Sequence, residues 1–67
     1  MTLMPYQQRV VEEKADLDVK REALNAFIGS PVFAATDSAE QVRLHHQAIH
    51  MLHYSCILGD RIDAFKD

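Results

Sequence analysis

The chain lacks the devices by which most very short proteins stabilise a fold. It has 67 residues and a single cysteine, Cys56, so no disulfide bond can form within it. A chain of this length buries a smaller share of its surface than a larger domain does, and is marginally stable alone. We therefore expect support from partner subunits or a metal. A lone reduced cysteine is typical of a cytosolic protein.

A strong charge of one sign and a long apolar run are also missing. The net charge is −3 with neutral histidines, and an acidic protein repels the phosphate backbone of duplex nucleic acid. No apolar run approaches the roughly 18 residues of a membrane span, and the N-terminus does not have the pattern of a signal peptide. The sequence predicts a soluble cytoplasmic protein that binds neither duplex nucleic acid nor a membrane.

Glycine and proline occur only twice each, and their positions indicate two long helices. Pro5 suits the first turn of a helix, where its missing N–H costs no hydrogen bond. Gly29 suits the C-terminal cap of that helix, and Pro31 stops it. Two overlapping capping boxes within residues 37–41 indicate the start of another helix. The predicted elements are a helix over about 5–28, a turn over 29–38 with room for a short helical turn, and a helix over about 39–65.

Each predicted helix carries two apolar lines. On the second helix, one line has alternating spacings of four and three residues, which is the pattern of a helix–helix seam. The other line consists of Val42, Ile49 and Cys56. A hairpin covers one face of each helix, and exposed apolar patches usually mark an interface. We predict an all-α single domain over residues 1–67, a two-helix antiparallel hairpin that assembles into a helical-bundle homo-oligomer. The predicted oligomer interface is Leu44, Ala48, Met51, Leu58, Ile62 and Phe65.

Three histidines share one face of the second helix. His46, His50 and His53 fall within about 60° of one another, and the first two have the spacing of a helical metal clip. The first helix offers only generic surface acids to complete such a site. The alternative is a solvated histidine-rich flank or a pH-sensitive contact between subunits. We favour this alternative and predict no metal and no cofactor.

Catalytic groups are not arranged for a reaction. Cys56 and His53 lie three residues apart on one helix, a spacing that rarely converges on a pocket. The chain has no glycine-rich loop to hold a phosphate or an oxyanion. Its carboxylates interleave with lysines and arginines, as on a solvated helix surface. We predict that the protein is not an enzyme.

Polar side chains suited to nucleotides form a line on each helix. On the second helix they lie within about 60° beside the seam. Arginine makes bidentate contacts with phosphate, and a tyrosine ring stacks on a nucleobase. The alternative is that the tyrosine completes the edge of the core and the arginines make ordinary ion pairs. The lines are Arg43, Gln47, His50, Tyr54 and Arg61 on the second helix, and Gln7, Lys14, Arg21 and Asn25 on the first.

A pattern over nearly the whole chain matches a group of known proteins. It comprises the run YQQRVVEEK at residues 6–14, then Leu17, Lys20, Leu24, Phe27, Ile28, Phe33, Glu40, Leu44, Gln47, Met51, Tyr54, Ser55, Leu58, Arg61, Ile62 and Phe65. This pattern resembles small phage-encoded helical proteins of the crAss-like-phage-related family, whose functions are mostly unassigned. The histidine cluster and Gly59 depart from it. The resemblance implies a phage or prophage origin and a place in the host-cell cytoplasm, but no activity.

Small phage accessory proteins often counter host defence, and two routes suit a short helical oligomer. One is a sponge that sequesters a cyclic-nucleotide immune signal in pockets between subunits. The other is an anti-CRISPR-like inhibitor that lays an apolar helix face on a host defence protein, and a phage structural or scaffolding role is a third. The polar lines favour the sponge. Its predicted ligand-binding residues are Tyr6, Gln7, Lys14, Arg21, Arg43, Gln47, His50, Tyr54 and Arg61.

Overall fold

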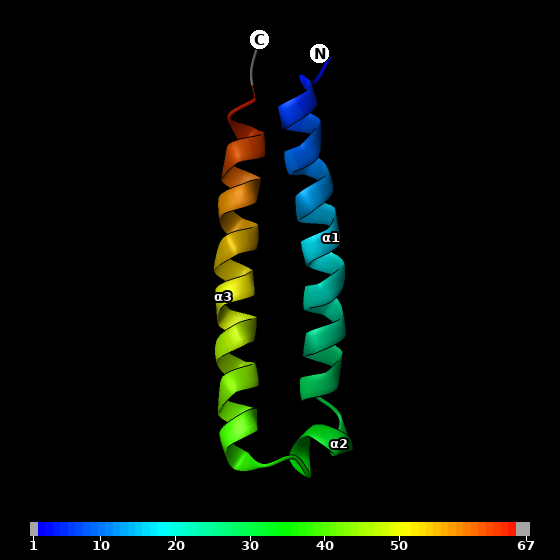
Figure 1. Ribbon diagram of the computed structural model, residues 1–67, viewed down its shortest axis with the longest axis vertical. Helices are drawn as coiled ribbons and strands as arrows, with labels where there is room; N and C mark the ends of the chain where they lie inside the picture. The colour runs from blue at the N-terminus through cyan, green and yellow to red at the C-terminus, as the bar shows by residue number, and fades with distance from the viewer. Residues whose placement is uncertain (1, 66–67) are drawn as a thin grey trace.

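The computed structural model describes residues 2–65, and all secondary-structure elements in that range are helices. The elements are α1 (Pro5–Ile28), α2 (Pro31–Ala34) and α3 (Ser38–Asp63). The prediction of an all-α chain is therefore confirmed, and α2 lies in the stretch predicted to hold a short helical turn. Figure 1 shows α1 and α3 side by side and antiparallel, with the N- and C-terminal ends together and α2 at the opposite end. The molecule is a rod with extents of 50 × 15 × 14 Å.

A serine joins the end of α1 to the start of α2. The Ser30 hydroxyl donates to the Phe27 carbonyl at 2.6 Å and accepts from the Phe33 amide at 3.3 Å. Pro31 follows at the first position of α2, where no amide hydrogen is needed. Gly29 occupies the C-cap of α1 with a φ of −81°, so its place there does not require a left-handed backbone. The turn between α1 and α2 is therefore held by the side-chain hydrogen bonds of Ser30.

A glutamine holds the turn before α3. The Gln41 amide Nε2 donates to the carbonyls of Phe33 at 2.9 Å, Ala34 at 3.3 Å and Thr36 at 2.9 Å. The predicted capping box that pairs Ser38 with Gln41 is wrong, because the Gln41 side chain reaches back to α2 and the turn after it. Only Asp37 acts as a cap, accepting from the Ala39 amide at 3.1 Å. These bonds tie the first turn of α3 to carbonyls at the end of α2 and just after it.

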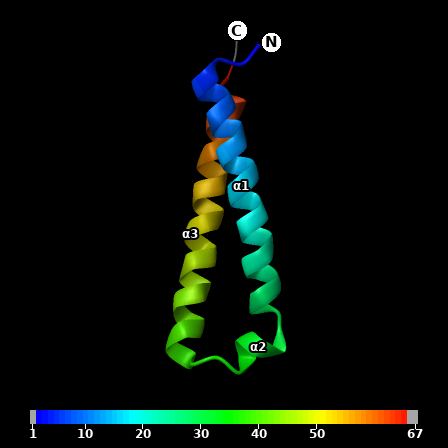
Figure 2. The same ribbon diagram turned by 45° about the vertical axis from the view of Figure 1, so that its right-hand side comes forward.

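The core is thin and lies along the contact between α1 and α3. Within residues 2–65 the buried apolar side chains are Val10, Phe33 and Leu58. Figure 2 shows α1 and α3 further apart toward α2 than toward the termini. Phe33 packs at this wider end, edge-on to Phe27 at 6.0 Å and to His45 at 5.3 Å. These two contacts anchor α2 to both long helices.

The predicted oligomer interface lies, within one chain, on the face of α3 that packs against α1. Leu58 is fully buried there, at 0% exposed. The role of this line between chains stays a prediction. The other five members are half-buried: Leu44, Ala48, Met51, Ile62 and Phe65.

The second apolar line of α3 is exposed. Val42, Ile49 and Cys56 lie on the surface of the single chain, with Leu52 beside them. On α1, Val19 is likewise exposed. None of the helices in residues 2–65 is long and apolar enough to cross a membrane.

Candidate functional site

The two cations of the α1 polar line are half-buried on the side of α1 that meets α3. Lys14 and Arg21 have side chains that are only 31% and 25% exposed. Gly59 of α3 lies against the Lys14 side chain, and a Cβ atom at that position would be in ordinary van der Waals contact with Lys14 Cε, at 3.4 Å.

Asp18 is the centre of a four-residue cluster that bridges α1 and α3. Its carboxylate accepts from Lys14 Nζ at 2.7 Å and from Arg21 Nη1 at 3.0 Å. Across the seam, the Ser55 hydroxyl donates to Asp18 Oδ1 at 2.6 Å. Hydrogen bonds from Lys14, then Ser55 and Arg21, hold the pKa of Asp18 well below its usual range. The cluster combines two cations with one carboxylate, so it carries excess positive charge inside an acidic protein.

The sequence contains a signal for this cluster, although its charge pattern also fits a solvated helix surface. Lys14 precedes Asp18 by four residues and Arg21 follows it by three, which are the spacings of ion pairs on a helix. Ser55 is only 3% exposed and interrupts the apolar seam of α3. A buried hydroxyl needs a hydrogen-bond partner, which either its own helix or the opposite helix can supply.

Replacing Asp18 with asparagine is expected to lower the urea midpoint of unfolding at neutral pH. The midpoint of the variant should also change less than that of the wild type as the pH is lowered. The folded chain lowers the pKa of Asp18 below the unfolded value of about 3.9. The ionised carboxylate therefore stabilises the fold above that value, and this stabilisation is lost as the pH falls below it. Urea titrations between about pH 7 and pH 2.5 would measure the effect. Asp16→Asn, a change at an exposed acid two residues away, is the control. Equal midpoints for the two variants at neutral pH would contradict the prediction.

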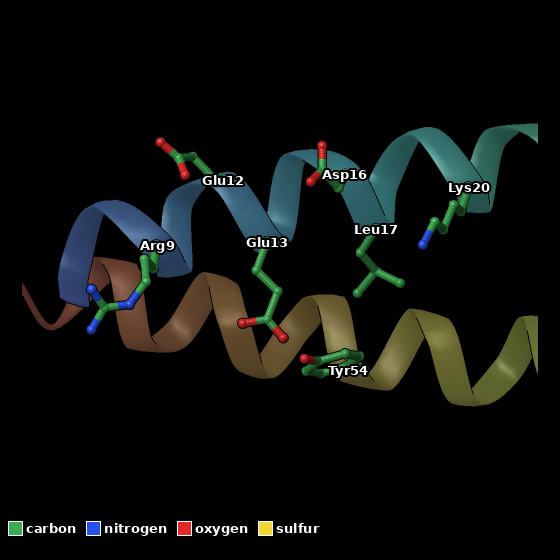
Figure 3. A pocket seen from close by; sticks show the side chains of 7 residues that line it. All are labelled: Arg9, Glu12, Glu13, Asp16, Leu17, Lys20 and Tyr54. Carbon is green, nitrogen blue, oxygen red and sulfur yellow. The ribbon is translucent and has the colours of Figure 1, made fainter. Parts of the chain in front are cut away.

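Tyr54 lines an acidic groove on one side of the rod. The groove has a volume of about 490 Å³ and is open to solvent. Figure 3 shows Tyr54 on α3 and Glu13 extending from α1 toward α3, while Glu12 and Asp16 point away. Glu13 thus places a carboxylate between α1 and the helix that carries Tyr54, where it would repel a phosphate. The groove is lined by Arg9, Glu12, Glu13, Asp16, Leu17, Lys20 and Tyr54.

A second groove contains no carboxylate. It has a volume of about 250 Å³ and lies between α1 and α3 toward the α2 end. Arg21 of the cluster forms part of its wall, and so does Asn25, one turn further along the α1 polar line. The complete lining is Arg21, Asn25, Ile28, His45, Ala48, Ile49 and Leu52.

The polar line of α3 does not converge on one site within a chain. Arg43 and Arg61 are 18 residues apart on one continuous helix, which corresponds to about 27 Å. Arg43 makes an exposed ion pair with Glu40 at 2.8 Å. The predicted use of both arginines for one small ligand therefore requires a second copy of the chain.

The remaining predicted ligand-binding residues occupy separate places. Gln7 caps α1, its Oε1 accepting from the Met4 amide at 2.8 Å. Tyr6 packs edge-on against Phe65 at 6.2 Å, at the end where the termini lie. Gln47 contacts the sulfur of Met51 at 3.7 Å, and His50 is exposed. None of these contacts joins the Asp18 cluster.

The three candidate metal-binding histidines are exposed on α3. His46, His50 and His53 lie on its surface. Over residues 2–65, histidine, cysteine, aspartate and glutamate side chains form no group of three or more that could hold a metal ion. Within the described residues, the arrangement of these histidines therefore indicates no particular ligand.

Comparisons with known proteins give the family. The model of the Sequestin family matches residues 4–64. A protein of Enterobacteria phage T4, described as an uncharacterized 7.5 kDa protein in the denB-rIIB intergenic region, is 39% identical over 64 residues, which cover 96% of this chain and 100% of that protein. No solved structure matches the chain. The prediction that it resembles a small phage protein is confirmed, and the chain belongs to the Sequestin family.

Proposed function

We propose that this chain counters host anti-phage defence by sequestering a phosphate-bearing nucleotide signal, with a cyclic nucleotide as the leading candidate. The ligand lies in pockets that copies of the chain form together, in the cytoplasm of an infected cell. The family name, Sequestin, and the phage relative are consistent with such a role. We also propose that the chain originates from the crAss-like phages in particular.

The observation that carries the proposal is the charge of the Asp18 cluster. Lys14 and Arg21 are half-buried beside one carboxylate, so one positive charge remains uncompensated within the cluster. An ammonium group has three N–H donors and a guanidinium has five. The bonds to Asp18 use one donor of each group. The remaining donors suit a phosphate, and partial exclusion of water strengthens such a contact.

A pocket between copies follows from the thin core and the exposed apolar line. Only three apolar side chains are buried within residues 2–65, whereas Val42 and Ile49 are exposed. A second copy that covers this line would also bring a second set of cations close to the first. Two cation clusters suit a ligand with two phosphates better than a mononucleotide.

Isothermal titration with cyclic dinucleotides, cyclic trinucleotides and pyrophosphate-linked cyclic nucleotides tests the proposal. We expect heat with fewer than one ligand per chain, and a rise in the melting temperature. Ligand at a hundred times its Kd stabilises the bound fold by about 2.7 kcal/mol. The matching nucleosides without phosphate are the control and are expected to give no heat. No heat and no thermal shift across the panel would end this reading.

We also propose that the chain binds its ligand without converting it. Cys56 is exposed on α3, and the described residues pair it with no base. Ligand recovered from the heat-denatured complex is therefore expected to be chemically unchanged by mass spectrometry. A hydrolysed or rearranged product would show that the chain is an enzyme.

A protein-binding inhibitor is the second candidate function. The exposed apolar side chains of α3 favour it, because such a helix face can lie in a groove of another protein. Recovery of one host defence protein in stoichiometric amount with the tagged chain, and loss of that complex in Ile49→Glu, would support the inhibitor. A phage scaffolding role would instead be indicated by co-purification with phage structural proteins.

A further inference from the structure

We infer that the nucleotide binds in the groove beside Arg21 and Asn25, with its phosphate on Arg21 and its base on the apolar wall of α3. This inference rests on the proposed function and places its site. It moves the site away from Tyr54, the tyrosine that the sequence favoured for stacking.

Charge separates the two grooves. The groove beside Tyr54 is larger, but Glu13 extends across it toward α3, and Glu12 and Asp16 add further carboxylates to its α1 side. The groove beside Arg21 has a guanidinium and no carboxylate in its lining. The Asp18 carboxylate that pairs with this guanidinium is shared with Lys14, so the two cations together exceed it in charge. Charges attract or repel one another more strongly near a protein surface than in bulk water. An anionic ligand is therefore attracted to the groove beside Arg21 and repelled by the carboxylates of the groove beside Tyr54.

The groove beside Arg21 also carries the groups that a base requires. Ile49 and Leu52 supply an apolar surface from α3, and nucleobases are held between aromatic or apolar side chains in protein pockets. Asn25 lies one turn beyond Arg21, about 6 Å along the helix. Its amide can donate to and accept from a base edge while the guanidinium holds the phosphate.

The size of this groove indicates that one chain binds part of the ligand. Its volume is about 250 Å³, below the roughly 300–1,000 Å³ of ordinary ligand pockets. Ile49 belongs both to the groove and to the exposed apolar line of α3. A second copy on that line would therefore complete the pocket, and a ligand of two nucleotides would then span two half-sites.

Asn25→Asp tests this placement with little change in shape, since Asn25 is exposed. The new carboxylate repels phosphate and lies four residues from Arg21, where it can pair with the guanidinium. We expect at least about a tenfold loss of affinity for the panel member that gives the largest heat. Tyr54→Ala, the matched change in the other groove, is expected to stay within about twofold of wild type, which is the normal result for a residue outside a binding hot spot. Circular dichroism checks that both variants keep their helices.

The alternative outcomes distinguish the site from the function. Loss of binding in Tyr54→Ala but not in Asn25→Asp would overturn the placement and leave nucleotide sequestration standing. If no panel member binds the wild-type chain, the proposed function fails, and inorganic phosphate observed by NMR then tests the groove alone. Shifts at Asn25 and His45 would support an anion site there, whereas no shifts, or shifts confined to Arg9 and Lys20, would overturn it.

Discussion

Leu58→Ala is expected to lower the free energy of unfolding by about 2–5 kcal/mol. Leu58 is 0% exposed between α1 and α3. Alanine removes most of its apolar contact and leaves a cavity in a core that has only Val10 and Phe33 as other buried apolar side chains within residues 2–65. At the usual 0.05–0.15 kcal/mol per residue, a chain of this length is stable by about 3–10 kcal/mol. The loss is therefore a large part of the whole and should be plain in urea unfolding followed by circular dichroism.

Ile57→Ala provides the matched control for this experiment. Ile57 is the adjacent residue on α3, but it is 57% exposed. Truncation of an exposed side chain usually changes stability by less than about 0.5 kcal/mol. Unfolding should be measured at several chain concentrations, because the stability of an oligomer depends on concentration. Equal losses in the two variants would mean that the contact between α1 and α3 does not stabilise the fold in the way that the structure indicates.

The positions of the helices follow from local chemistry and could be predicted. Pro5 marks the start of α1, and Ser30 with Pro31 separates it from the next helix. Each of these signals acts within one turn of backbone. The three carbonyl bonds of Gln41 could not be predicted, because they depend on how α2 folds back beside the start of α3. A glutamine three residues after a serine has the same local pattern in a capping box.

The face of α1 that meets α3 was harder to predict, and the site depended on it. Val10, Leu17 and Leu24 form one apolar line of α1. Smaller groups, including Val19, form another. Periodicity alone does not say which line packs inward. In the structure, Val10 is buried and Val19 is exposed. This orientation of α1 about its axis places Lys14 and Arg21 at the contact between α1 and α3.

The Asp18 cluster shows why charged residues on a helix are difficult to assign from sequence. Asp16 and Asp18 are both acids among lysines and arginines, and both suit a solvated surface. Only the opposite helix distinguishes them, because Ser55 reaches Asp18 across the seam. The sequence therefore identified the two cations and missed the carboxylate that positions them. It also favoured Tyr54, because a line of residues on a helix gives no information about the acids of a neighbouring helix.

Ile49→Glu is expected to weaken self-association by at least about 30-fold, because a charge buried at an interface without a partner costs about 2–5 kcal/mol. Ile49 lies at the middle of the exposed line, seven residues from Val42 and seven from Cys56, and is itself 49% exposed. A second copy that covers this line must bury residue 49. Sedimentation velocity over a range of concentrations would measure the change. Circular dichroism would show that the variant stays helical, since the substituted side chain is exposed within one chain.

Ile57→Glu is the control that shows whether the effect depends on where the new charge lies or only on the added charge. It makes the same chemical change at a side chain that is 57% exposed, but residue 57 lies about 80° around α3 from residue 49. We expect it to associate like the wild-type chain, and dissociation of Ile57→Glu alone would place the interface on the histidine flank. A wild-type chain that sediments as a folded single copy at low concentration would remove the shared pocket. If the pocket does lie between copies, a ligand that binds it must promote association by mass action. Ile49→Glu should then lose ligand binding and self-association together, because residue 49 belongs to both surfaces.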